Sequence, residues 1–227
     1  MLKLVRFSVV LSSMTFSILV DASDVAIGVG IDSRYISEGR DNTDKTALKY
    51  MEVTTDDVAG FSLGLWHGRS NFEDYHETNL SVSREWGLTK WASVGLDYTY
   101  LDFSGDEPSD HEVSLSWVVE ITTSLALDVT STYSEESEGV YSTVGIAYIT
   151  GIKNFEFSPY ASIGINNDYV ADEHNGADHY AVGVELSYSL EEFSVGGHIS
   201  AVAPIDEEPG DTLVESTWLG LNVSYNF

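Results

Sequence analysis

Apolar and polar residues alternate without exception along the last nine residues of the chain. From residue 219 to residue 227 every odd position is apolar and every even position is Gly, Asn or Ser, and the sequence stops on Phe227. A period of two is typical of a β-strand, whose successive side chains point to opposite faces of a sheet. The pattern therefore predicts a strand with one apolar face and one polar face.

The same alternation predicts about eleven earlier strands. The least regular of them is the second, because Lys49 and Glu52 fall on opposite faces. Most of the runs have about nine to eleven residues, the length of a tilted strand that crosses a membrane. The predicted strands cover residues 24–35, 47–54, 60–67, 75–86, 91–101, 111–120, 123–133, 141–150, 155–166, 179–190, 193–203 and 218–227.

The connections between these strands alternate strictly between short and long. Short ones fall at residues 56–59, 87–90, 121–122, 151–154 and 191–192, and long polar ones at 37–46, 69–74, 102–110, 134–139, 167–178 and 204–216. A soluble β-sandwich has no reason to sort its loops in this way. Short turns on one side and long loops on the other are typical of an up-and-down barrel in an outer membrane. We therefore expect an all-β fold, a transmembrane antiparallel up-and-down β-barrel of about 12 strands.

The first 22 residues have the pattern of an export signal. Lys3 and Arg6 precede an apolar stretch from residue 7 to 20, and Val20-Asp21-Ala22 resembles a small-residue cleavage site. About fourteen apolar residues are too few for a transmembrane helix, which needs about 20. The sequence thus predicts a signal peptide at residues 1–22 and a single barrel domain at 23–227.

Aromatic residues cluster near the ends of the predicted strands. Interfacial girdles of an outer-membrane barrel require this placement, whereas a soluble core would scatter aromatics through strand centres. Those near strand ends are Tyr35, Trp66, Trp86, Trp91, Tyr100, Tyr133, Tyr141, Phe155, Phe193, Trp218, Tyr225 and Phe227.

Two resemblances sharpen this interpretation. The final strand resembles the closing strand of bacterial outer-membrane barrels, in which the last Phe and an alternate aromatic, here Phe227 and Tyr225, form the assembly signal. The segments Ser33-Arg-Tyr-Ile-Ser-Glu-Gly39 and Gly60-Phe-Ser-Leu-Gly-Leu-Trp66 resemble the TorF-type porin family. These resemblances imply export to the bacterial outer membrane, contact with its lipid and with the barrel assembly machinery, and a pore. They name no solute and supply no catalytic residues.

The charge of the chain is strongly negative. Without residues 1–22, which include Lys3, Arg6 and Asp21, eight basic residues remain against 36 acidic ones, a net charge of −28. Binding of nucleic acid by phosphate neutralisation is therefore excluded as a function class. The chain has no Cys, so neither disulfides nor thiolate metal sites contribute. Solvation of exposed loops is the simplest role for the excess of acids.

Alternation also predicts which charged side chains face the lumen. Seven acids, one Arg and one His are expected there: Asp32, Arg34, Glu77, Glu85, Asp97, Asp128, Glu156, Glu185 and His198. An acidic lining selects for cations and repels anions. The alternative is that Arg34 and the acids form a hydrogen-bonded plug, because a twelve-stranded barrel is wide enough for a small channel or for none.

An enzyme is the weaker hypothesis. His198 and Ser200 put a base and a nucleophile on one strand face, a spacing that resembles an outer-membrane phospholipase. Both face the predicted lumen, whereas a lipid hydrolase needs its nucleophile toward lipid. The spacing identifies no third group that would orient the His. We expect no catalytic site.

Metal and cofactor sites are not expected either. The loops at residues 172–179 and 206–211 hold hard oxygen ligands for Ca²⁺, but neither has the spacing of an EF-hand loop. The sequence predicts a small passive channel for cations or neutral solutes. A closed structural or adhesive barrel with acidic external loops is the alternative, and a lipid-modifying enzyme is the third hypothesis.

Overall fold

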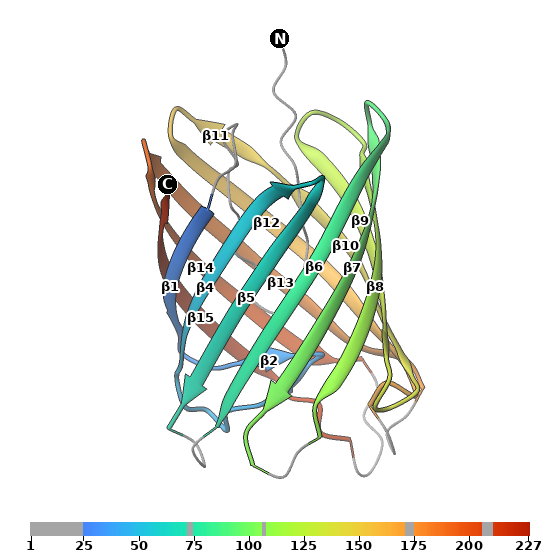
Figure 1. Cartoon of the computed structure of the whole chain (residues 1–227). Coiled ribbons are helices and arrows are strands. Elements are labelled where there is room, and N and C mark those ends of the chain that lie inside the picture. The colour runs from blue at the N-terminus through green and yellow to red at the C-terminus, as the bar shows by residue number, and fades with distance from the viewer. Residues whose placement is uncertain (1–24, 72–74, 106–107, 171–174, 206–210) are drawn as a thin grey trace.

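Twelve antiparallel strands form one closed barrel, as the sequence predicts (Figure 1). Residues 1–24, which include the predicted signal peptide, lie outside the described part of the chain. The described part contains no helix long and apolar enough to cross a membrane. The computed structural model describes residues 25–71, 75–105, 108–170, 175–205 and 211–227.

Each strand of the barrel pairs with its neighbours along the chain, and β1 closes the barrel against β15. Three short strands lie outside this series: β11 (Thr150–Ile152) extends the pairing along β12, and β2 (Ile36–Ser37) pairs with β3 (Arg40–Asp41) in a small hairpin. The barrel strands are β1 (Val25–Asp32), β4 (Leu48–Val58), β5 (Phe61–Ser70), β6 (His76–Thr89), β7 (Ala92–Phe103), β8 (Asp110–Glu120), β9 (Leu125–Ser134), β10 (Val140–Tyr148), β12 (Phe155–Asn167), β13 (Gly176–Leu190), β14 (Phe193–Pro204) and β15 (Ser216–Asn226).

Closure depends on the alternating last strand. The pairing of β1 with β15 runs from Ala26 opposite Asn226 to Asp32 opposite Gly220. The other side of β1 pairs with β4, so that every barrel strand has two partners. A closed ladder leaves no row of unpaired backbone groups, which is the condition for a sheet to lie in lipid.

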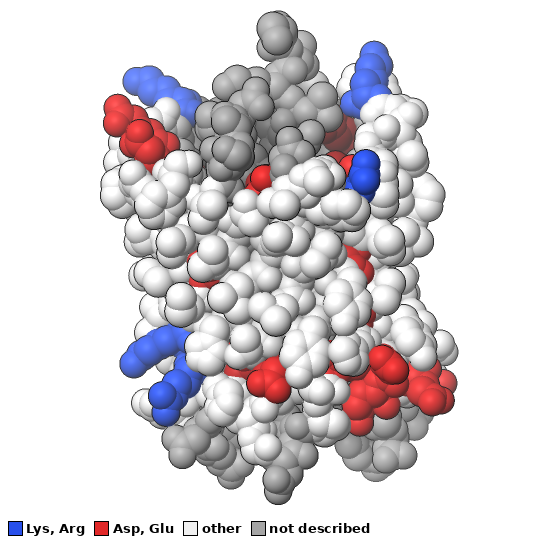
Figure 2. Space-filling view, viewed as in Figure 1, with Lys and Arg blue, Asp and Glu red and all other residues white. Residues whose placement is uncertain are grey.

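The outer face of the barrel is apolar and the inner face is polar or small. Leu221 and Val29 are 61% and 55% exposed on the outside, whereas the alternate residues Asp32 and Ala26 are 4% and 7% exposed. Figure 2 shows charged side chains gathered toward the two ends of one face, with a mostly uncharged band between them. This is the distribution that a bilayer favours, with lipid against the band and water at both ends.

The two ends of the barrel differ. The short turns all lie at the end near which β1 begins and β15 ends, and the six longer connections lie at the opposite end, where Figure 1 shows β2. We call this second end the loop end. Its largest connection, residues 33–47 between β1 and β4, contains the β2–β3 hairpin.

Several aromatic residues expected in the girdles point inward instead. Tyr35 is 4% exposed and stacks on Trp66 with ring centroids 5.8 Å apart, and Tyr141 is 7% exposed. The Trp218 ring meets His198 edge-on on the inner face. The prediction is wrong for these four, because residues near a strand end fall on either face and the loop end encloses its own apolar cluster. Tyr35, Leu48 and Tyr50 form that cluster.

Candidate functional site: the lumen and its mouth

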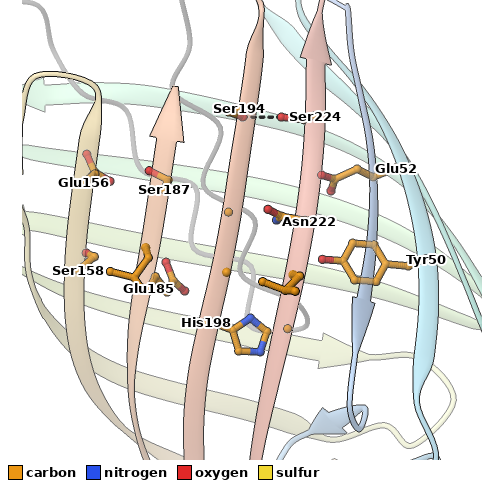
Figure 3. A pocket seen from close by; sticks show the side chains of 15 residues that line it. Tyr50, Glu52, Glu156, Ser158, Glu185, Ser187, Ser194, His198, Asn222 and Ser224 are labelled. Carbon is orange, nitrogen blue, oxygen red and sulfur yellow. Dashed lines mark hydrogen bonds between the residues drawn. The ribbon is translucent and has the colours of Figure 1, made fainter. Parts of the chain in front are cut away.

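Acidic side chains from both halves of the barrel line the lumen. Residues on either side of such an acid within its strand face outward, as Leu127 and Val129 do around Asp128. Glu156 and Glu185, on the neighbouring strands β12 and β13, line one side of a pocket in the wall, and Glu52 of β4 lines the other side (Figure 3). The inward acids of the barrel strands include Asp32, Glu52, Glu77, Glu85, Asp97, Glu112, Asp128, Glu156 and Glu185.

Basic side chains take other positions. Lys49, Arg69 and Arg84 are on the outer face, where the guanidinium of Arg84 lies 5.1 Å from the ring centre of Phe61. Lys45, Lys90 and Lys153 lie in exposed turns. Arg34 and Arg40 belong to the connection at the loop end. Among the described residues of the barrel strands, no Lys or Arg therefore faces the lumen, and the wall has a negative potential.

The β2–β3 hairpin folds inward and narrows the loop end. The Arg40 guanidinium lies 3.3 Å from the Asp178 carboxylate of β13, and the pair is buried, with Asp178 0% exposed. The backbone N–H of Val214 donates to the Gly39 carbonyl at 2.9 Å. Gly39 has φ 78° and no side chain, and a Cβ there would lie 2.8 Å from Nδ1 of His179. Only Gly fits this close approach in this conformation.

The base of the hairpin is fixed to the opposite part of the wall. The Tyr35 hydroxyl donates to the Glu77 carboxylate at 3.3 Å, and the Tyr75 hydroxyl donates to it at 2.6 Å. Asn79 donates a third hydrogen bond to Glu77 at 2.7 Å. Burial and the negative charge of Glu77 raise the pKa of Tyr35 well above its usual range, so its hydroxyl keeps the proton that it donates. Residues 33–47 therefore reach from β6 to β13 across the mouth.

The hairpin tip carries a carboxyl group of its own. Glu38 lies in the turn, accepts a hydrogen bond from the Ser37 hydroxyl, and is only partly accessible to water. Desolvation is the largest effect on Glu38 and raises its pKa, although Ser37 and Arg40 act in the opposite direction. Nearby, Tyr169 donates to Glu112, and burial raises the pKa of this tyrosine. The mouth is thus a network of carboxyls and hydroxyls around one buried Arg.

The predicted lumen residues occupy four kinds of place. Asp32, Asp97, Asp128, Glu156, Glu185 and His198 line the inner wall, and Glu77 belongs to the network at the mouth. Glu85 is exposed near the short-turn end of β6. Arg34 differs from the expectation, because β1 ends at Asp32 and the chain turns. Its guanidinium donates to Ser216 at 2.9 Å and lies 3.7 Å from the Asp41 carboxylate, so it belongs to the connection at the loop end and not to a barrel strand.

Sequence reasoning missed Glu52, Glu112 and Asp178. Glu52 belongs to the strand in which Lys49 obscured the alternation, although Lys49 is near the loop end, where its ammonium group can reach water. Glu112 alternates with the outward Val113, which is a usable signal. Asp178 lies in a predicted loop, and its partner Arg40 is 138 residues away in sequence. Nothing local to either residue indicates their contact.

His198 and Ser200 do not hydrogen-bond to each other. The Ser200 hydroxyl accepts a hydrogen bond from the Tyr160 hydroxyl at 2.8 Å and is 3% exposed. His198 has Asp32 at 3.9 Å, which is too long for a hydrogen bond. Both lie on the inner face, away from lipid. Within the described residues there is also no group of three potential metal ligands, while residues 171–174 and 206–210 of the candidate Ca²⁺ loops lie outside them.

Comparison with known proteins identifies the fold. A KdgM porin matches with a TM-score of 0.64 and 14% identity over 89% of this chain and 99% of that chain. A structure of the KdgM porin in complex with disordered oligogalacturonate matches with a TM-score of 0.62 and 12% identity, over 90% of this chain and 99% of that chain. A NanC porin matches with a TM-score of 0.59 and 12% identity, also over 90% of this chain and 99% of that chain. The fold is that of small outer-membrane porins. No protein-family model and no curated protein sequence matches the chain.

Proposed function

We propose that this protein is a passive channel of the bacterial outer membrane that admits small cations and neutral solutes. One observation carries the proposal: the charged side chains that face the lumen from the described barrel strands are acids, and the basic ones are turned outward or lie in the connections. A lining of one sign raises the local concentration of counter-ions and opposes ions of its own sign.

The same observation argues against anionic sugars as solutes. Oligogalacturonate, named in one KdgM complex, is a polyanion. In this chain a polyanion would meet carboxylates such as Asp97, Asp128 and Glu156, without an opposing Lys or Arg on the described strands. We therefore infer that the shared fold serves a different class of solute here.

The proposal includes the cellular setting. The apolar outer band fits contact with outer-membrane lipid, and the signal peptide predicted at residues 1–22 would direct export. Tyr225 and Phe227 are proposed to be recognised by the barrel assembly machinery. Membership of the TorF-type family rests on the segments at residues 33–39 and 60–66 and stays a prediction.

Conductance across a planar bilayer tests the channel. The refolded protein should conduct, and the reversal potential in a KCl gradient should show a preference for K⁺ over Cl⁻. The Debye length falls from about 10 Å at 0.1 M to about 3 Å at 1 M salt, so the preference should fade in concentrated salt. An anion preference at all salt concentrations would contradict the proposal.

Two isosteric substitutions isolate the charges. Asp97→Asn together with Asp128→Asn removes two lumen carboxylates with almost no change in volume and should reduce the preference for K⁺. Glu135→Gln makes the same kind of change in an exposed connection between β9 and β10 and should leave selectivity unchanged. Equal selectivity in all three proteins would show that the lumen acids do not set it.

A closed structural or adhesive barrel is the second candidate, and the inward hairpin favours it. The tip at Gly39 and Arg40 contacts β13 and the segment before β15, so that the bore is narrowed at its loop end. A refolded barrel that inserts into bilayers yet carries no current would favour this candidate over the channel.

A further inference from the structure

Four inward polar side chains form one row across neighbouring strands. Ser158 pairs with Glu185, Glu185 with His198, His198 with Gly220, and Gly220 with Asp32. The row therefore crosses β12, β13, β14, β15 and β1 in the direction of the hydrogen bonds between the strands. Figure 3 shows Ser158, Glu185 and His198 on the same side of the wall. We call these five residues the Gly220 row.

The absence of a side chain at Gly220 brings two members of the row together. A Cβ at this position would lie 1.9 Å from Oδ1 of Asp32 and 2.3 Å from Cε1 of His198. Both side chains therefore extend over the Gly220 backbone from the two flanking strands. The Asp32 carboxylate and the His198 ring still stay 3.9 Å apart, so they do not satisfy each other by a hydrogen bond.

The polar atoms of the row lack hydrogen-bond partners. Oδ1 of Asp32, Oγ of Ser158, Oε2 of Glu185 and Nε2 of His198 have none among the described residues. Asp32, Ser158 and Glu185 are only 4%, 3% and 7% exposed. Buried polar groups are almost always paired, and a buried acceptor without a donor is costly. Hydroxyls elsewhere on the wall, such as those of Thr130 and Ser162, are also unpaired, but among the described residues the buried, unpaired carboxylates and the buried, unpaired imidazole all belong to this row.

The surroundings specify the charge of the missing partner. Glu156 and Glu185 are diagonal neighbours on β12 and β13, a spacing of about 7 to 8 Å at which like charges repel. Glu52 lines the same pocket. None of the described residues that line this pocket is a Lys or an Arg. A cationic partner with several N–H donors would donate hydrogen bonds to these acceptors and would offset the repulsion between the carboxylates.

We propose that the Gly220 row binds the ammonium group of an amine-bearing solute, which deepens and rests on the proposed cation channel. An ammonium group offers three donors, and the Asp32 carboxylate and Nε2 of His198, 3.9 Å apart over Gly220, offer it two acceptors, with Glu185 as the cross-strand neighbour of His198. Glu156 and Glu52 continue the pocket beyond the row, and Glu156 is two residues from Ser158, about 7 Å along its strand. A small diamine can thus place one ammonium in the row and the other beside Glu156 or Glu52.

Current block by 1,4-diaminobutane tests the proposal. Added to one side of a bilayer that contains the protein in KCl, the diamine should reduce the K⁺ current in a voltage-dependent manner. The uncharged 1,4-butanediol at the same concentration should not. Equal block by the diol would overturn the proposal, because it would show simple filling of the pore.

Gly220→Ala separates geometry from charge. The added methyl group displaces Asp32 and His198 while every carboxylate stays in the chain. The blocking concentration should rise about tenfold, the effect of losing one hydrogen bond to a charged group. Gly87→Ala is the matched control, because a Cβ at this position would have nothing within 4 Å. The diamine should block this variant at the same concentration as the unmodified protein. If the diamine blocks Gly220→Ala and the unmodified protein at the same concentration, general attraction by an acidic lumen explains the block, and the proposal is overturned.

A second variant and a second measurement complete the test. Asp32→Asn combined with Glu185→Gln keeps the backbone and the volumes and should also raise the blocking concentration. If K⁺ flows but the diamine never blocks, the row is not an amine site and the channel still stands. If no current flows, the channel proposal fails, and calorimetric titration of the diamine into the detergent-solubilised barrel decides the inference. Saturable binding that Gly220→Ala weakens supports it, and no binding overturns it.

Discussion

Replacing Arg40 by Met should open the mouth of the barrel. The guanidinium lies 3.3 Å from the carboxylate of Asp178, whose side chain is 0% exposed. At this distance and an effective dielectric constant of about 20, the Coulomb attraction is about 5 kcal/mol. Removal of one partner of a buried pair typically costs about 3 to 5 kcal/mol. The hydrogen bond from Val214 to Gly39 contributes only about 1 kcal/mol, too little to hold the hairpin tip against that loss.

The barrel itself should survive this substitution. The twelve strands retain their ladder, and Tyr35 still holds the hairpin base to Glu77. We therefore expect Arg40→Met to give a larger single-channel conductance with unchanged heat-modifiable migration of the folded protein. Arg84→Met is the matched control, because Arg84 lies on the outer face over Phe61 and Trp86 and should not affect conductance.

A double-mutant cycle measures the pair directly. Asp178→Asn alone should also loosen the tip, and the double variant should be less perturbed than the sum of the two single ones, because contacting residues couple. Unaltered conductance and current noise in Arg40→Met would refute the reasoning, since the buried pair would then not hold the hairpin.

Three further outcomes can be measured. Val184→Arg puts a charge on the outer face and should cost about 2 to 4 kcal/mol in a folding titration from urea into lipid, whereas Ser187→Arg, on the inner face, should cost far less; equal costs would contradict the facing of β13. Deletion of Phe227 should sharply lower the amount of folded protein in the outer membrane, and unchanged amounts would contradict its role in assembly. Burial raises the pKa of Glu38 above its usual value of 4.5, so the docked hairpin binds a proton that the released hairpin does not. Acid should therefore favour docking, and docking should weaken as the pH rises through the raised pKa. Because the docked hairpin narrows the mouth, conductance should fall in acid. Glu38→Gln should remove that pH dependence, and an identical pH profile in this variant would contradict the assignment.

The strands could be predicted from sequence because their pattern is local. The run at residues 155–166 corresponds to β12 (Phe155–Asn167), and the run at 193–203 to β14 (Phe193–Pro204). A lipid-facing side must be apolar along the whole strand, so the period of two persists from one end to the other. The strict sorting of loop lengths supplied the topology.

The mouth could not be predicted because its contacts are not local. Residues 24–35 read as one strand, but β1 ends at Asp32, and the chain turns inward at Ser33 and Arg34. The hairpin is fixed by Arg40 and Asp178, 138 residues apart in sequence, and by backbone pairing to Val214. Alternation says which face of a strand a residue occupies, and it says nothing about a loop that enters the bore.

The separation of these two kinds of information explains how the fold can persist while the charge of the lumen changes. Backbone hydrogen bonds close the barrel, and lipid constrains only the outward positions, so the inward positions can change without loss of the fold. KdgM matches this chain at 14% identity with a TM-score of 0.64. In this chain inward glycines such as Gly220 and Gly30 leave room for the side chains of neighbouring strands, and a Cβ at Gly30 would lie 2.3 Å from the Tyr50 ring. Large polar side chains can therefore lie flat against the wall. Selectivity then depends on which charges occupy those positions, and here they are carboxylates.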